Sequence, residues 1–176
     1  MATVTPLRPG GGTAPSQPVI RPADGPADIE TVRALFLEYA AGLGFSLCFQ
    51  DFDAELAGLP GDYAPPAGGL WLAERNGAAL GCVGLRPMEE PDICEIKRLY
   101  LRPVARGLGL GRVLAETAIA AARGQRYSAM RLDTVDSMAT AQSLYRALGF
   151  RERPPYGSHR HPMLRYFELA LAAPSR

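Results

Sequence analysis

The stretch Arg106-Gly107-Leu108-Gly109-Leu110-Gly111-Arg112 is the most informative segment of this chain. An extended segment, Glu95 to Leu101, precedes it, and a segment with helical periodicity, Leu110 to Arg123, follows it. A glycine-rich turn at the start of a helix presents backbone N–H groups to an anion. Glycine has no Cβ, so the anion can approach the chain closely. The stretch therefore predicts a cradle for the phosphate groups of a cofactor.

The amino-acid sequence of this cradle excludes two common nucleotide-binding motifs. The dinucleotide pattern G-x-G-x-x-G fails because its last position falls on Arg112 or on Leu114. The P-loop pattern G-x-x-x-x-G-K-[ST] fails because Gly107 leads to Arg112 and then to Val113. A different phosphate-bearing cofactor is therefore expected.

A third pattern, [QR]-x-x-G-x-[GA], fits at Arg106, Gly109 and Gly111. It is the coenzyme A pyrophosphate signature of the GNAT family of N-acetyltransferases, which the chain resembles here. The resemblance implies acetyl-CoA as cofactor and acetyl donor, with no metal. It also implies that backbone amides of the cradle hold the pyrophosphate while Arg106 and Arg112 supply charge. The implied cradle residues are Arg106, Gly107, Leu108, Gly109, Leu110, Gly111 and Arg112.

The order of the remaining elements supports this resemblance. Residues 1–18 are rich in Pro, Gly, Ser and Thr and predict a disordered tail, which leaves 19–172 as a single domain. Expected strands are 19–21, 70–74, 79–86, 95–101, 130–135 and 163–171, with Phe150 as a further strand position. Expected helices are 28–42, 53–59, 110–123 and 138–148. The resemblance implies a mixed α/β fold: a central, mostly antiparallel sheet, flanked by helices, that splays between its fourth and fifth strands.

Composition fits a cytoplasmic protein of this kind. The 176 residues are 47% hydrophobic, yet no apolar run approaches the ~20 residues of a membrane span, and no signal peptide is visible. The three cysteines form no C-x-x-C, as expected in a reducing cytoplasm. His159 and His161 lack ligand partners at metal spacing, so we expect a solvated loop.

The net charge of +1 gives no reason to expect nucleic-acid binding, but the charge is unevenly distributed. Residues 95–112 hold five basic side chains and one acidic one, a net +4. The rest of the chain therefore sums to −3. This pattern indicates positive charge around the cradle, although a charged sheet edge is an alternative.

A second motif, Leu144-Tyr145-Arg146-Ala147-Leu148-Gly149-Phe150, is similar to the L-Y-x-x-x-G-F ending of a helix in this family. The resemblance implies that Tyr145 reaches the coenzyme A sulfur and donates a proton as the thiolate leaves. A phenol suits that task in a dry site. Taken alone, Tyr145 also fits an apolar core stripe with Met138, Ala141, Leu144 and Leu148. The chain departs from the family at Met138, where many relatives carry an asparagine that contacts the cofactor.

Glu95 lies eleven residues before Arg106, the distance at which histone-acetylating members place their general base. A water chain could serve instead, and Glu95 could simply pair with Lys97 or Arg98. Strict strand alternation would put Glu95, Lys97, Leu99 and Leu101 on one face and Ile96, Arg98 and Tyr100 on the other.

The resemblance also gives a role to the backbone of Leu99, Tyr100 and Leu101. At the splay their N–H and C=O groups would bond to the pantetheine arm of the cofactor like an added strand. One N–H would polarise the thioester carbonyl.

The acceptor is not readable from the sequence. The resemblance implies that residues 43–52 and 154–161 enclose it, and Asp51 or Asp53 could attract a cationic amine, although helix capping is the favoured interpretation for them. A small-molecule amine, an amino acid and a protein N-terminus stay open, as does a homodimer. The leading hypothesis is an N-acetyltransferase in which the amine attacks directly in a ternary complex. A non-catalytic acyl-CoA-binding module and a nucleotide-binding enzyme are the alternatives.

Overall fold

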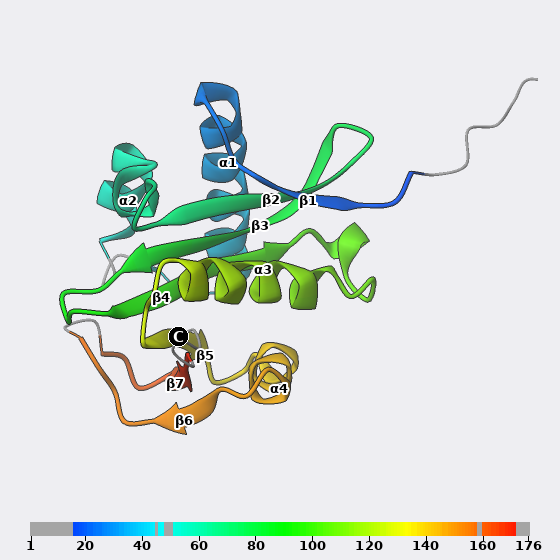
Figure 1. The fold of residues 1–176 in the computed structure, drawn as a ribbon. Helices are drawn as coiled ribbons and strands as arrows, with labels where there is room; N and C mark the ends of the chain where they lie inside the picture. The colour runs from blue at the N-terminus through cyan, green and yellow to red at the C-terminus, as the bar shows by residue number, and fades with distance from the viewer. Residues whose placement is uncertain (1–15, 45, 48–50, 158–159, 172–176) are drawn as a thin grey trace, which may run out of the picture.

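The computed structural model describes residues 16–44, 46–47, 51–157 and 160–171 (Figure 1). Residues 1–15 of the predicted tail therefore lie outside the described residues, and 16–18 belong to no helix or strand. The helices are α1 (Pro26–Gly42), α2 (Phe52–Gly58), α3 (Leu110–Gly124) and α4 (Ala139–Ala147), with 3₁₀ turns η2 (Gly61–Tyr63) and η3 (Pro103–Ala105). The strands are β1 (Val19–Pro22), β2 (Gly69–Arg75), β3 (Ala78–Pro87), β4 (Ile93–Leu101), β5 (Ala129–Val135), β6 (Arg151–Arg153) and β7 (Leu164–Ala170).

The strands form one seven-stranded sheet in the order β1-β2-β3-β4-β5-β7-β6. Every neighbouring pair is antiparallel except β4 and β5, which are parallel. The predicted hairpin between β2 and β3 turns at Asn76 and Gly77, both with positive φ, as a two-residue turn of this kind requires. The predicted mixed, mostly antiparallel sheet is confirmed. The late strand at Phe150 begins one residue later, at Arg151.

The predicted splay lies between β4 and β5. Their pairing covers only three positions and ends with Glu95 opposite Arg131. Beyond it, β4 continues to Leu101 and β5 to Val135 without pairing to each other. The two strands therefore leave facing edges with unused backbone groups, and the predicted splay is confirmed.

A β-bulge interrupts β4 in the same region. Its register against β3 shifts between Cys82 and Gly84, so that Arg98 and Leu99 stand opposite the single residue Val83. Arg98 carries the bulge with a φ of 56°, a left-handed conformation that is uncommon for a residue other than glycine.

The bulge changes which side chains share a face, so the predicted alternation is wrong. Lys97 and Arg98 both lie on the side of α1 and α2, where Arg98 covers the ring of Phe52. Leu99 and Leu101 pack instead into the core on the side of α3. Strict alternation holds only for a regular strand, and the inserted residue reverses it after Arg98.

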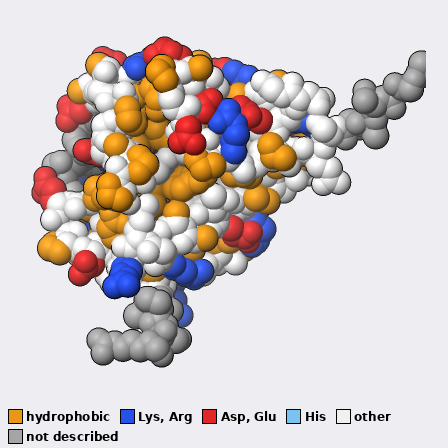
Figure 2. All heavy atoms as spheres, turned by 45° about the horizontal axis from the view of Figure 1, so that its top comes forward, with side chains coloured by type: hydrophobic (Ala, Val, Ile, Leu, Met, Phe, Trp, Pro, Cys, Tyr) orange, Lys and Arg blue, Asp and Glu red, His pale blue; other side chains and the backbone are white. Residues whose placement is uncertain are grey.

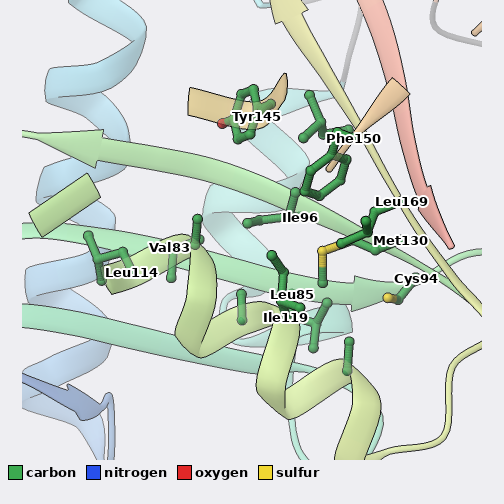
Figure 3. Packing of buried hydrophobic residues seen from close by; sticks show 14 of the residues in the cluster. Val83, Leu85, Cys94, Ile96, Leu114, Ile119, Met130, Tyr145, Phe150 and Leu169 are labelled. Atoms are coloured by element: carbon green, nitrogen blue, oxygen red, sulfur yellow. The ribbon is translucent and has the colours of Figure 1, made fainter. Parts of the chain in front are cut away.

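The two larger of the three apolar clusters among the described residues enclose the sheet. One lies under α3 and α4 and includes Val83, Leu114 and Met130, which are fully buried (Figure 3). The other lies under α1 and α2 around Phe36 and Leu72, also fully buried. Each such side chain contributes roughly 1.5–3 kcal/mol through burial. The sheet is thus fixed from both sides, and the splay opens within a rigid frame.

The surface mixes charges of both signs. Figure 2 shows one face on which Lys and Arg side chains lie beside Asp and Glu, with apolar side chains between them. Among the described residues, no helix is long and apolar enough to cross a membrane.

Candidate active site

The cradle has the backbone shape that its glycines predict. Gly107 and Gly109 both adopt a φ of 76°, and a Cβ built at either would meet only open space. Gly109 is the N-cap of α3 and supplies no side-chain cap. Within the described part of the chain, the N–H groups of residues 107–111 make no hydrogen bond. The loop and helix start therefore present a row of free donors to an anion.

Two arginines frame this row of donors. The Arg106 Nε donates to the Leu101 carbonyl at 3.2 Å, and the Arg112 Nη1 lies 3.1 Å from Glu116 Oε1 on the surface of α3. The other cations of residues 95–112 are engaged elsewhere. They form the pairs Lys97–Asp133, Arg98–Glu55 and Arg102–Glu38. Of the five basic residues in the predicted segment, only Arg106 and Arg112 therefore supply positive charge at the cradle.

A strand edge that β5 leaves unpaired continues from the splay toward the cradle. Tyr100 and Leu101 pair with β3 on one side, opposite Cys82 and Gly81. Their other side faces β5 across the splay, where pairing has already ended. The backbone of residues 99–101 is thus open on the side where the resemblance expects the pantetheine arm.

Tyr145 lies in α4 on the side of the sheet covered by α3. It is 7% exposed, and its ring packs edge-on against Phe150 at 5.7 Å between centroids. Its hydroxyl points away from Phe150 (Figure 3) and makes no hydrogen bond within the described residues. Burial raises the pKa of this phenol well above its usual value, and Tyr39 and Asp133 add to the effect. Tyr145 therefore keeps its proton at neutral pH.

Gln142, which sequence reasoning missed, is the other buried side chain of α4. Its Nε2 donates to the carbonyls of Asp136 at 2.8 Å and Val135 at 3.2 Å, and so ties α4 to the end of β5. Met138, the departure from the family pattern, is the N-cap residue of α4, and its Sδ accepts a contact from Thr134 at 3.8 Å. The sequence did contain a signal for Gln142, because it is a polar residue one turn before Tyr145 on a helix face that is otherwise apolar.

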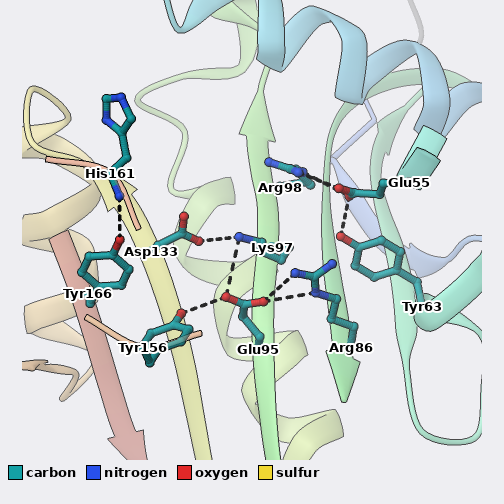
Figure 4. Close-up of polar contacts among 10 residues, drawn as sticks. All are labelled: Glu55, Tyr63, Arg86, Glu95, Lys97, Arg98, Asp133, Tyr156, His161 and Tyr166. Atoms are coloured by element: carbon teal, nitrogen blue, oxygen red, sulfur yellow. Dashed lines mark hydrogen bonds and ion pairs between the residues drawn. The ribbon is translucent and has the colours of Figure 1, made fainter. Parts of the chain in front are cut away.

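A charged cavity of about 460 Å³ opens beside the splay on the side of α1 and α2. Its lining includes Arg86, Glu95, Lys97, Asp133 and Tyr156 (Figure 4). Glu95 is the centre of this group. Its Oε2 accepts from Arg86 at 2.9 and 3.1 Å, and its Oε1 accepts from the Tyr156 hydroxyl at 2.8 Å.

Glu95 has features of both predicted roles, that of a general base and that of a structural carboxylate. It is 4% exposed and pairs with Lys97, with 3.6 Å between Nζ and Oε1, as an ordinary structural carboxylate would. It also faces the cavity at the last paired position before the splay. Arg98, the other partner considered, pairs with Glu55 instead, at 2.6 Å. Burial disfavours the Glu55 carboxylate, but the Arg98 guanidinium holds its pKa below the usual value.

The segments expected around an acceptor are only partly described. Residues 45 and 48–50 lie outside the described residues, as do 158–159 with His159. Asp51 stands at the N-cap of α2 without a side-chain cap bond, and no role in binding an amine is tested for it or for Asp53. The His161 backbone N–H donates to the Tyr166 hydroxyl at 3.3 Å. Among the described side chains, no cluster of three or more His, Cys, Asp or Glu could hold a metal.

Sequence reasoning expected Tyr156 near the acceptor only as a member of segment 154–161, and it did not assign Arg86, Lys97 or Asp133 to the acceptor cavity. Arg86, Lys97, Asp133 and Tyr156 come from β3, β4, β5 and the loop after β6. Glu95 and Tyr156 are 61 positions apart in the chain, and Lys97 and Asp133 are 36 apart. No local pattern connects such positions.

Known proteins resemble this chain over most of its length. A family model described as the acetyltransferase (GNAT) family matches residues 32–150. An uncharacterised N-acetyltransferase of Schizosaccharomyces pombe is 39% identical over 148 residues, which cover 84% of this chain and 91% of that protein. The uncharacterised N-acetyltransferase YjgM of Escherichia coli is 34% identical over 142 residues, 78% of this chain and 84% of that one.

Solved structures share the fold. A GNAT-family acetyltransferase of Staphylococcus aureus superposes with a TM-score of 0.74 at 21% identity, over 89% of this chain and all of that one (100%). The Salmonella typhimurium protein yncA, solved with its cofactor acetyl-CoA, gives 0.66 at 22% identity over 92% and 98% of the two chains. The family model covers more than half of the chain, and the two sequence relatives are each more than 30% identical over more than two thirds of it. The chain is therefore an acetyltransferase that belongs to the GNAT family.

Proposed function

We propose that this enzyme transfers an acetyl group from acetyl-CoA to a primary amine by direct attack in a ternary complex. The observation that carries the proposal is the row of free N–H groups at residues 107–111, which ends beside two splayed strand edges. Acetyl-CoA supplies an acetyl thioester, and the transfer forms a C–N bond as the C–S bond breaks. The amine loses one proton, and the departing sulfur gains one.

The donor side fits coenzyme A in both charge and shape. The free amides and Arg106 and Arg112 suit a pyrophosphate, and Gly107 and Gly109 have no Cβ that would keep it from the backbone. The β4 edge at Leu99, Tyr100 and Leu101 is unpaired with β5 and can bond to the amides of the pantetheine arm, although the Leu101 carbonyl already accepts from Arg106 Nε. The complex of yncA with acetyl-CoA, on the same fold, adds support.

The acceptor side fits a cationic amine. The charged cavity is lined by five acids and two bases, a formal charge of −3, which Arg131, paired with Glu90 from outside the lining, reduces to −2. Both bases, Arg86 and Lys97, are already paired with carboxylates. The surplus negative charge attracts an ammonium group, whether it belongs to a small molecule or to a peptide. The acids are Asp62, Glu89, Glu90, Glu95 and Asp133.

Two residues on opposite sides of the splay would move the protons. Glu95 faces the charged cavity and takes the proton of the incoming ammonium, directly or through water. Tyr145 belongs to the core under α3 and α4, keeps its proton at neutral pH, and donates it to the leaving thiolate.

Ligand-dependent melting tests the donor. We expect acetyl-CoA and CoA to raise the melting temperature, because a ligand at 100 times its Kd adds about 2.7 kcal/mol to the free energy of unfolding. ATP and NAD should leave it unchanged. A shift with NAD and none with CoA would overturn the proposal.

Thiol release over a panel of amines then tests the transfer. We expect free CoA to appear only when protein, acetyl-CoA and an accepted amine are all present. Tight acetyl-CoA binding without thiol release from any amine, including lysine-bearing and N-terminal peptides, would favour a non-catalytic acyl-CoA-binding module.

A further inference from the structure

An ion pair bridges the mouth of the splay. Backbone pairing of β4 with β5 ends at Glu95 and Arg131, and the next positions on the same face are Lys97 and Asp133. Their side chains meet across the gap, with 2.5 Å between Lys97 Nζ and Asp133 Oδ1. Where the backbone no longer fixes the distance between the strands, this side-chain contact does.

Both partners of this bridge are buried. The side chain of Lys97 is 7% exposed and that of Asp133 is 9% exposed. Burial costs each charge its hydration, so such a pair adds little stability compared with apolar side chains of the same size. Its physical effect lies in the geometry that it imposes on the two strands.

Lys97 also contacts a carboxylate on its own strand. Its Nζ lies 3.6 Å from Glu95 Oε1, the oxygen that accepts the Tyr156 hydroxyl (Figure 4). A single ammonium therefore lies between Glu95 on β4 and Asp133 on β5 and is attracted to both. Without it, two buried carboxylates would face each other, of which Glu95 keeps its ion pair with Arg86.

The bridge also separates two spaces. Lys97 and Asp133 line the charged cavity of about 460 Å³ and, on their other side, a small cavity of about 20 Å³ with Tyr39, Thr134 and Val135. The small cavity lies inside the mouth of the splay, where β5 runs on to Val135 unpaired with β4. The pair thus forms the partition between the acceptor side and the splay.

We propose that Lys97 is a positioning residue for acetyl transfer: its ammonium ties Asp133 to Glu95 across the splay, sets the gap that receives the thioester, and holds the Glu95 carboxylate toward the acceptor cavity. The proposal rests on the proposed function, because both the thioester and the acceptor belong to it.

Substitution of Lys97 by methionine and by arginine tests this. Lys97→Met keeps the length of the side chain and removes its charge. We expect weaker acetyl-CoA binding and a kcat lower by about 10- to 100-fold, because misplacing reacting groups by about 1 Å has a cost of this order. Lys97→Arg keeps a cation that can reach both carboxylates, and should recover most of that loss. If Lys97 only filled space, the bulkier arginine would be at least as harmful as methionine, and the proposal would fail.

A double variant covers the case in which Lys97→Met does not fold. Lys97→Met combined with Asp133→Leu removes both charges and should recover the melting temperature, because no unpaired charge stays buried. Its kcat should stay low. A double variant with wild-type kcat and acetyl-CoA affinity would contradict the positioning role.

Two controls separate this proposal from the proposed function. Arg21→Met breaks the ion pairs with Asp28 and Glu74 near β1, away from the site, and should leave kcat and acetyl-CoA affinity unchanged. The wild-type protein is measured first by calorimetric titration with acetyl-CoA and by thiol release. No binding in the wild type would end the proposed function, whereas wild-type behaviour of Lys97→Met would end only the role of Lys97.

Discussion

The cradle and the charged cavity, which lie on the two sides of the splay, are built in different ways. The cradle consists of the backbone of consecutive residues, 107–111, and its donors are N–H groups at a helix start. The charged cavity consists of side chains that β3, β4, β5 and the loop after β6 bring together. One site needs a particular chain conformation, and the other needs particular side chains.

This difference matches what each site would have to recognise. A pyrophosphate is the same in every reaction of an acetyl-CoA-dependent enzyme, so a fixed backbone site serves it. The acceptor differs from one enzyme to the next, and exchanged side chains can adapt a cavity without altering the sheet. The predictions below test each site separately.

The largest expected effect is a loss of kcat when Tyr145 can no longer donate a proton. Tyr145→Phe should lower kcat by about 100-fold, the lower range for loss of a positioned general acid, and leave acetyl-CoA affinity nearly unchanged. Tyr127→Phe is a matched control, because its hydroxyl donates to the Ala67 carbonyl away from the splay. An unchanged kcat in Tyr145→Phe would refute the role.

Glu95 provides the corresponding test on the acceptor side. Glu95→Gln keeps the shape but cannot accept a proton, and should lower kcat/KM by at least about tenfold. It should also remove the acidic limb of the pH–rate profile. A variant that kept this limb would exclude Glu95 as the base and favour a water chain.

The addition of a single methyl group to the cradle should weaken acetyl-CoA binding. Gly109→Ala strains a φ of 76° and places a Cβ in the open space beside the free amides, so acetyl-CoA affinity should fall by about tenfold, or 1.4 kcal/mol. Gly77→Ala adds the same strain at a φ of 77° in the β2–β3 turn. It should lower the melting temperature equally and leave acetyl-CoA affinity unchanged, as calorimetry and thermal melts can show.

The charge of the acceptor cavity should produce a smaller effect. Among 1,5-diaminopentane, pentylamine and 5-aminopentanoate, kcat/KM should fall in that order, by about fivefold per charge, as expected for ~1 kcal/mol of partly screened attraction. Asp62→Asn should reduce the advantage of the diamine, since Asp62 is an exposed acid of the lining. A preference for the carboxylate would contradict a cation-selective cavity.

The smallest effect concerns stability in alkali. Burial raises the pKa of Tyr63, Tyr145 and Tyr156 in the folded protein, whereas unfolded tyrosines ionise near pH 10. The stabilisation is therefore complete below about pH 10 and is lost as the pH rises beyond it. In urea titrations, Tyr145→Phe should lessen this loss by about 0.8 kcal/mol at pH 10.5. An equally steep loss in the variant would contradict the burial effect.

The same difference explains what the sequence could predict. The cradle, the hairpin at Asn76 and the helix of Tyr145 depend on neighbouring residues, and their patterns are local. The bulge at Arg98 depends on how β4 pairs with β3, so the predicted faces of β4 were wrong from that residue onward. The contact of Lys97 with Asp133 depends on the sheet order, which no local pattern contains.

A thermodynamic cycle of ligand and protein tests the central claim, that the backbone cradle holds the pyrophosphate. Wild type and Gly109→Ala are each titrated with acetyl-CoA and with S-acetylpantetheine, which lacks the pyrophosphate and the nucleoside. We expect the substitution to weaken acetyl-CoA binding by about tenfold and to leave the affinity for S-acetylpantetheine unchanged. Equal weakening of both ligands would contradict it.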